Sequence, residues 1–291
     1  MAFLSYLING LGLGSVYAII ALGYTMVYGI AKMLNFAHGD IIMIGAYVAF
    51  FALSRFQLPL FVSVILSIVV CTILGVVIER LAYKPLRQAS SLSVLITAIG
   101  VSYFLQNAAQ LLWTSNTKVF PSIVSNAYLK IGDLSISYLT IITIAVCIAI
   151  MIVLTLFISK TKTGMAMRAC SEDKGAAMLM GINVNTTISI TFAIGSGLAA
   201  IASILLCATY PSVYPTLGSM PGIKAFTAAV FGGIGSIPGA FLGGLMLGVI
   251  ETLTKAYIST QLSDAIVFAV LIVGLLIKPT GLLGKKISEK V

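Results

Sequence analysis

Long apolar blocks alternate with short polar connections along the whole 291-residue chain. A helix needs roughly 20 apolar residues to cross a bilayer core about 30 Å thick, and most of the blocks approach or exceed that length. The blocks are apolar on every side, whereas strands of a membrane barrel alternate between lipid-facing and lumen-facing residues. The pattern predicts an all-α, polytopic transmembrane bundle. The predicted blocks are 4–31, 39–54, 59–79, 92–113, 138–159, 186–210, 224–258 and 262–277.

The block 224–258 is interrupted by residues that disfavour a helix. The nine residues from Phe231 to Gly239 include four glycines and one proline, and both residue types oppose a continuous helix. We expect two helices or half-helices joined by a glycine-rich turn. Unwound backbone at membrane depth is tolerated where it is buried in protein or lines a watery cavity, and the alternative is close helix packing through small residues. The candidate pathway residues here are Gly232, Gly233, Gly235 and Ser236.

Basic residues collect in alternate connections, and this asymmetry orients the chain. Connections rich in lysine and arginine lie in the cytoplasm, which predicts an outer N-terminus and an inner C-terminus. The composition, 59% apolar and 9% charged, belongs in lipid, so the net charge of +9 indicates orientation and not nucleic-acid binding. Twelve of the seventeen basic residues are expected inside: Lys32, Arg80, Lys84, Arg87, Lys160, Lys162, Arg168, Lys174, Lys278, Lys285, Lys286 and Lys290.

Candidate chemistry is sparse. The single histidine lies in a polar insert after the first block, where Asn35 or Asp40 is expected to cap a helix. Glu251 stands inside an apolar stretch, either near a pathway or paired with Lys255 one turn away. Four scattered cysteines and the absence of a GxxxxGK[ST] loop predict no metal, cofactor or nucleotide site in this chain. The groups available favour neither an enzyme nor an ion-coupled secondary transporter.

Two further polar features belong to the inner connections. Glu79 and Arg80, at the inner end of the third block, are expected to form an interfacial ion pair. The longest inner connection, 159–185, begins with basic residues and then places acids before a short apolar run that ends at a glycine. That order is typical of a self-capped helix, expected over 172–181. Its apolar side fits a groove on a partner or the membrane surface. That side consists of Ala176, Ala177, Leu179 and Met180.

Several motifs together resemble one family. The spacing Ala176-Ala177-x-x-x-Gly181 resembles the cytoplasmic coupling loop of ABC-importer permeases, although Gly175 stands where that loop usually has its acid. More specific motifs resemble the LivH-type permeases of high-affinity branched-chain amino-acid importers. They are Asn35-Phe36-Ala37-His38-Gly39-Asp40, Gly45-Ala46-Tyr47, Glu79-Arg80-x-x-Tyr83-x-Pro85-Leu86-Arg87, Gly222-x-Lys224-Ala225-Phe226, Gly232-Gly233-Ile234-Gly235-Ser236-x-x-Gly239-Ala240, Glu251 and Pro279-Thr280-Gly281-Leu282.

The resemblance implies a single permease domain over 1–291 in the bacterial inner membrane, with a coupling loop at about 159–185. It also implies three kinds of partner: a LivM-like second permease subunit or another copy, two ATPase subunits that bind ATP and magnesium, and a periplasmic solute-binding protein. The implied substrate is leucine, isoleucine or valine, with urea, short amides and other amino acids as alternatives. Such a zwitterion needs a few dipoles, which the glycine-rich break and residues such as Thr97 offer. The implied coupling residues are Glu172, Asp173, Ala176, Ala177 and Gly181.

Overall fold

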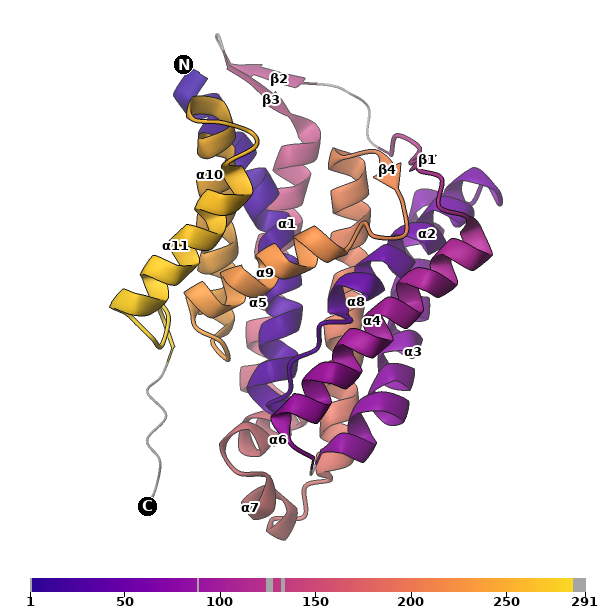
Figure 1. The fold of residues 1–291 in the computed structure, drawn as a ribbon, viewed down its shortest axis with the longest axis vertical. Coiled ribbons are helices and arrows are strands. Elements are labelled where there is room, and N and C mark those ends of the chain that lie inside the picture. The colour runs from indigo at the N-terminus through magenta and orange to yellow at the C-terminus, as the bar shows by residue number, and fades with distance from the viewer. Residues whose placement is uncertain (1, 88, 124–127, 132–133, 285–291) are drawn as a thin grey trace. The chain divides into compact units, whose positions relative to one another are not determined.

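The computed structural model describes residues 2–87, 89–123, 128–131 and 134–284. Six helices in these ranges are long and apolar enough to cross a membrane, which confirms the predicted helical membrane bundle (Figure 1). Two shorter apolar helices accompany them, α2 (His38–Ser54) and α11 (Ser263–Ile277). The six long helices are α1 (Ala2–Ala31), α3 (Leu60–Ile78), α4 (Ser91–Trp113), α5 (Tyr138–Lys160), α8 (Val184–Thr209) and α10 (Ile237–Tyr257).

The remaining elements are short. A π-turn (Glu79–Tyr83) and a 3-10 turn (Lys84–Leu86) extend α3, and the helices α6 (Lys162–Glu172) and α7 (Lys174–Leu179) follow α5. The helix α9 spans Ser219–Gly232. The described residues also form two antiparallel strand pairs, β1 (Lys118–Val119) with β4 (Ser212–Val213), and β2 (Tyr128–Ile131) with β3 (Leu134–Ser137).

The chain divides into two compact units. Unit 1 comprises residues 1–25, 126–151 and 224–291, and unit 2 comprises residues 26–125 and 152–223. Within unit 1, glycines bring α1 and α10 close together. A Cβ placed on Gly14 would lie 2.7 Å from the Leu245 carbonyl oxygen, and one on Gly10 would lie 2.8 Å from Val249 Cα. Small residues on facing helices permit this approach.

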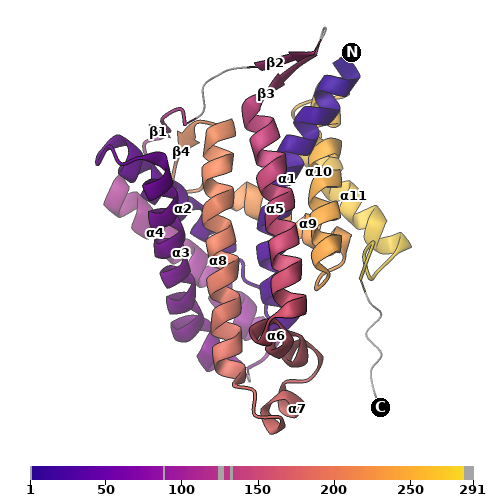
Figure 2. The same cartoon turned by 180° about the vertical axis from the view of Figure 1, so that it is seen from behind.

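Within unit 2, α2, α3 and α8 pack against one another, as Figures 1 and 2 show. Here too the contact depends on small residues: a Cβ on Gly45 would lie 2.7 Å from Ser203 Oγ, and one on Gly75 would lie 2.6 Å from Ser196 Cβ. Ser67 Oγ donates a hydrogen bond to the Gly45 carbonyl at 3.0 Å. The core of unit 2 is therefore built from close backbone contact and small polar groups, and not from large side chains alone.

The predicted break in the block 224–258 is present. The helix α9 ends at Gly232 and α10 begins at Ile237, so four residues form the turn. Gly233 and Gly235 adopt φ values of +108° and +93°, which side chains other than glycine rarely tolerate. Ser236 Oγ accepts a hydrogen bond from Gly239 N at 3.2 Å and thereby caps α10. One boundary differs, because α9 begins at Ser219 and not at 224.

Candidate functional site

The connection 159–185 contains two helices, and the prediction of one helix starting at Glu172 is wrong at that end. Glu172 is the last residue of α6, and Asp173 has extended backbone angles between α6 and α7. Its Oδ1 accepts hydrogen bonds from Gly175 N at 2.7 Å and Ala176 N at 3.0 Å. An aspartate that satisfies two free N–H groups starts a helix more favourably than it continues one. The acid at 173 is thus the N-cap of α7.

The predicted glycine cap at the other end of α7 is confirmed. Gly181 adopts φ +80°, its N–H donates to the Met178 carbonyl at 3.0 Å, and Ile182 N–H donates to the Ala177 carbonyl at 3.0 Å. This pattern closes the helix through a left-handed residue. No atom lies within 4 Å of a Cβ placed on Gly181, so its role is conformational and not a close contact.

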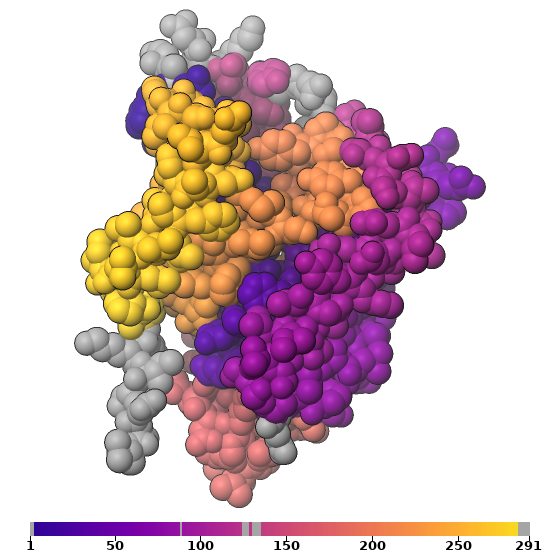
Figure 3. Space-filling model, in the orientation of Figure 1, coloured from indigo at the N-terminus to yellow at the C-terminus, as the bar shows by residue number. Residues whose placement is uncertain are grey.

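The side chains of α7 divide between the protein and its surface. Ala177 is only 3% exposed, so the prediction that it belongs to an accessible apolar face is wrong: it packs inside its own chain. Three consecutive side chains are well exposed instead, Met178 at 60%, Leu179 at 90% and Met180 at 81%. In the space-filling view the salmon-coloured surface of the connection that holds α6 and α7 protrudes (Figure 3). A short capped helix with an exposed apolar tip is an arrangement suited to docking.

Lys174 anchors the start of α7. Its Nζ donates a hydrogen bond to the Ala31 carbonyl, at the end of α1, at 2.7 Å. Burial of the ammonium and the nearby cations Arg87 and Lys32 hold the pKa of Lys174 below its usual value. This end of unit 2 therefore concentrates positive charge around the first turn of α7.

The polar insert before α2 does not cap that helix, contrary to prediction. The N-cap of α2 is Ala37, without a side-chain hydrogen bond. Asn35 Oδ1 accepts from the Tyr83 hydroxyl at 2.9 Å, and Asp40 Oδ1 accepts from Gln106 Nε2 at 2.9 Å. Both side chains are buried in unit 2, at 3% and 2% exposure. Their oxygens therefore accept hydrogen bonds from buried side-chain donors, and not from the backbone N–H groups at the start of α2.

The polar side chains that surround Asp40 carry no charge of their own. Gln106 Nε2 also contacts Ser102 Oγ at 3.2 Å and Ser219 Oγ at 3.3 Å, so the cluster joins α2, α4 and the start of α9. Within the described ranges, no lysine or arginine forms an ion pair with Asp40. A buried carboxylate without a neighbouring cation is costly at membrane depth and marks a functional candidate. The sequence placed Asp40 in a motif but gave no sign of Gln106 as its partner.

Glu251 belongs to a cluster in which charges balance. The predicted pair with Lys255 is present at 2.6 Å, but Lys224 Nζ also reaches Glu251 Oε1 at 2.8 Å and the Tyr17 hydroxyl donates to Oε2 at 2.9 Å. Lys224 in turn pairs with Asp264 at 2.6 Å. These groups tie α1, α9, α10 and α11 together within unit 1. The pattern of the sequence showed only the partner four residues away.

Glu79 pairs with Arg87 and not with Arg80, so the predicted neighbouring pair is wrong. Ser189 Oγ donates to the second oxygen of Glu79 at 2.6 Å, and Arg87 also donates to Asn185. The backbone passes through a π-turn from Glu79 to Tyr83. This wider turn changes which side chains face α8, and it directs the fully buried Glu79 carboxylate toward that helix.

The candidate pathway residues fall into two places. Gly232, Gly233, Gly235 and Ser236 lie in or beside the turn of unit 1, whereas Thr97 is half-buried in α4 of unit 2. The segment after α11 packs on the turn, because Leu282 N–H donates to the Phe231 carbonyl and Leu283 N–H donates to the Gly232 carbonyl, both at 2.9 Å. Close backbone packing thus accounts for part of the glycine content, and a role of these residues in a pathway stays a prediction.

Membrane-length helices, buried ion clusters between them and a short capped helix with an exposed apolar tip define a polytopic membrane protein. The chain belongs to the family described as the permease component of branched-chain amino acid transport systems, which matches residues 6–275. It is 47% identical to the high-affinity branched-chain amino acid transport system permease protein BraD of Pseudomonas aeruginosa and 45% identical to LivH of Escherichia coli, over 99% of this chain and 98% of each relative.

A solved structure shares the fold. One chain of PsaBC from Streptococcus pneumoniae in complex with Fab has a TM-score of 0.51 at 16% identity, and the match covers 94% of this chain and 92% of that one. At this level of identity the likeness concerns the arrangement of helices and not the solute.

Proposed function

We propose that this chain forms, with a second permease subunit, the membrane pathway of an ABC importer for leucine, isoleucine and valine. The observation that carries the proposal is the likeness over nearly the whole chain to BraD and LivH, at 47% and 45% identity. The ATP and magnesium that drive transport bind to separate ATPase subunits. A periplasmic solute-binding protein delivers the amino acid, and the second permease subunit is LivM-like or another copy of this chain.

The single permease domain over 1–291 lies in the bacterial inner membrane with its N-terminus outside and its C-terminus in the cytoplasm. The distribution of lysine and arginine between connections supports this orientation. It places the connection 159–185, with α6 and α7, on the side where ATPase subunits bind.

The helix α7 couples this chain to an ATPase subunit. Caps at Asp173 and Gly181 fix both of its ends, and Lys174 ties its first turn to the end of α1. The exposed side chains of Met178, Leu179 and Met180 form the surface that enters a groove on the partner. A helix held in this way transmits a displacement of the ATPase to the membrane helices as a rigid element. Glu172 and Ala176, both exposed, border this surface.

The cluster around Asp40 favours a substrate that carries a positive group. A buried carboxylate with neutral partners supplies a countercharge to the ammonium of a zwitterion, whereas urea and short amides bring no charge for it. Gly232, Gly233, Gly235, Ser236 and Thr97 remain candidate pathway residues that offer dipoles.

Uptake by the reconstituted complex tests the proposal. With both permease subunits, the ATPases and the binding protein in proteoliposomes, labelled leucine should enter with ATP hydrolysis, and urea should not. Leu179→Ser should reduce leucine-stimulated ATP hydrolysis, while Met165→Ser, an exposed position on α6 at 50%, should leave it unchanged. Equal activity of the two variants would reject the docking role of α7. Uptake of urea in place of leucine would reject the substrate.

A further inference from the structure

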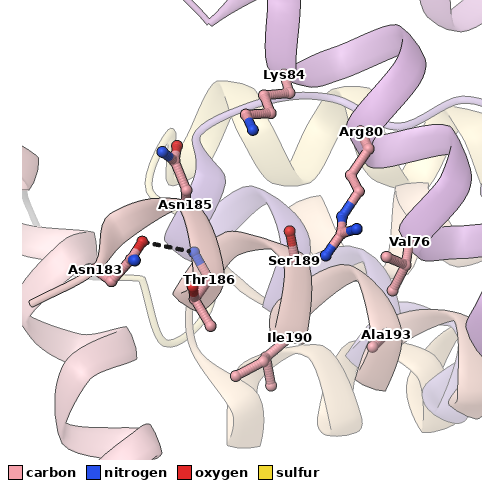
Figure 4. Close-up of a pocket in the computed structure, with 9 residues that line it drawn as sticks. All are labelled: Val76, Arg80, Lys84, Asn183, Asn185, Thr186, Ser189, Ile190 and Ala193. Carbon is pink, nitrogen blue, oxygen red and sulfur yellow. Dashed lines mark hydrogen bonds between the residues drawn. The ribbon is translucent and has the colours of Figure 1, made fainter.

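A cavity of about 560 Å³ lies in unit 2 where α3 and its π-turn end beside the first turns of α8. Figure 4 shows Arg80 and Lys84 extending from one side toward α8. The polar lining on the α8 side includes Asn185, Thr186 and Ser189. Asn183 Oδ1 accepts from Thr186 N at 3.1 Å and caps the helix. The site described for transport does not use this cavity.

The positive charge of the cavity is not neutralised by the protein. Glu79 is the nearest acid in sequence, but its two oxygens are engaged by Arg87 and Ser189. Arg80 and Lys84 form no hydrogen bond or ion pair with any residue that the structure describes. The N-terminus of α8, a helix of 26 residues, adds a positive partial charge to the same place. The cavity therefore attracts an anion.

Part of the lining of the cavity is apolar. Val76 on α3 and Ile190 and Ala193 on α8 lie among the polar groups. The exposed face of α3 also carries a stripe of apolar side chains at intervals of four residues. The stripe consists of Phe61, Ile65, Val69, Ile73 and Val77, each between 43% and 75% exposed. Such a stripe on a membrane-length helix faces hydrocarbon. It ends at Val77, three residues before Arg80, so an apolar surface runs along α3 up to the basic side chains of the cavity.

We propose that this cavity binds the phosphate group of an anionic phospholipid, with the acyl chains along the exposed stripe of α3. Arginine matches phosphate oxygens with two parallel donors, and lysine adds a point charge. Free phosphate would satisfy the cations but would leave the apolar part of the lining, and the stripe on α3, without a ligand. Arg80 and Lys84 belong to a connection rich in basic residues, which faces the leaflet where anionic lipids attract such groups.

The test compares two double variants that remove the same charge from the same unit. In the first, Arg80→Gln and Lys84→Gln empty the cavity of cations. The control, Lys160→Gln with Lys162→Gln, alters two exposed residues outside it. Native mass spectrometry of the purified complex, titrated with phosphatidylglycerol or phosphatidylcholine, measures binding. Wild type and control should retain phosphatidylglycerol over phosphatidylcholine, and the cavity variant should bind it on the order of ten-fold more weakly.

Further arms separate the sources of the anion. Titration with inorganic phosphate should give no saturable binding that depends on Arg80 and Lys84; binding of inorganic phosphate with no preference among lipids would overturn the proposal. Arg80→Lys with Lys84→Arg should keep the lipid, which guards against a variant that merely misfolds. Equal lipid retention by the cavity variant and the control would also overturn it. So would loss of the ATPase subunits with lipid retention intact, because the cavity would then be a protein interface.

Discussion

The Glu251 carboxylate accepts a hydrogen bond from Lys224 Nζ at 2.8 Å, although the two residues stand 27 positions apart. Lys224 lies in α9 and Glu251 in α10, on either side of the glycine-rich turn. Glu251 is 1% exposed, so water does little to screen the pair. The turn supplies the change of direction, and this ion pair fixes how the two helices meet after it.

Lys224→Met is expected to destabilise the protein strongly. The substitution removes the more buried of the two lysines that pair with Glu251, together with the lysine that pairs with Asp264, and it keeps a similar apolar stem. Breaking a buried pair by removing one member costs about 3 kcal/mol or more. Thermal unfolding of the purified complex in detergent measures the effect. Lys255→Met is the matched control, because Lys255 is 34% exposed and an ion pair so accessible to solvent contributes about 1 kcal/mol or less. If both variants lost the same thermal stability, the buried pair of Lys224 would contribute no more than the accessible pair of Lys255.

Gly75→Ala is expected to disrupt the packing of α3 on α8. The new Cβ would lie 2.6 Å from Ser196 Cβ and 3.2 Å from the Phe192 carbonyl oxygen, so the helices must separate, at a cost of about 1–3 kcal/mol. Gly100→Ala is the control, since no atom lies within 4 Å of its Cβ and alanine favours a helix by about 1 kcal/mol. The melting temperature should fall for the first variant and hold or rise for the second. A fall of the same size in both would contradict close packing at Gly75.

The sequence predicted the helices well because lipid imposes a length and a uniform apolarity on each of them. The block 92–113 became α4 over Ser91–Trp113, and the break at Gly233 appeared where glycine and proline cluster. The start of α9 was missed because Ser219 to Ile223 includes Pro221 and Gly222, which disfavour a helix in isolation. Tertiary packing of that segment in unit 2 overrides the local preference.

Side-chain partners were predicted only where they are local. The pair of Glu251 with Lys255 follows from a spacing of four residues, and the closure of α7 follows from the glycine at position 181. The π-turn from Glu79 to Tyr83 lets Glu79 pair with Arg87, and no residue pattern in the sequence predicts such a turn. The bond from Gln106 to Asp40 spans 66 residues, so only the packed structure reveals it. Ala177 illustrates the same limit, because one face of a short helix turns inward for reasons that lie in other segments.

Asp40→Asn is expected to preserve or raise stability and to impair transport. Asparagine keeps an oxygen for Gln106 Nε2 and removes a buried charge that no lysine or arginine in the described part of the chain neutralises by an ion pair. Asp40→Leu should lower the melting temperature, because it leaves the Gln106 amide without its acceptor, at a cost of about 1–3 kcal/mol. Melting temperature and leucine uptake are measured together. If Asp40→Asn transports leucine normally, the carboxylate has no part in recognising the ammonium group.

Asp173→Ala is expected to weaken coupling through the cap of α7. Alanine offers no acceptor to Gly175 N and Ala176 N, which costs about 1 kcal/mol. A six-residue helix has few other bonds to compensate, so the tip of Met178, Leu179 and Met180 loses its fixed position. Leucine-stimulated ATP hydrolysis by the complex should fall by several-fold while the melting temperature changes little. Asp173→Asn retains the cap and should restore the rate. Failure of asparagine to restore it, with the complex still assembled, would mean that the charge of Asp173 meets the ATPase directly and that its cap is incidental to coupling.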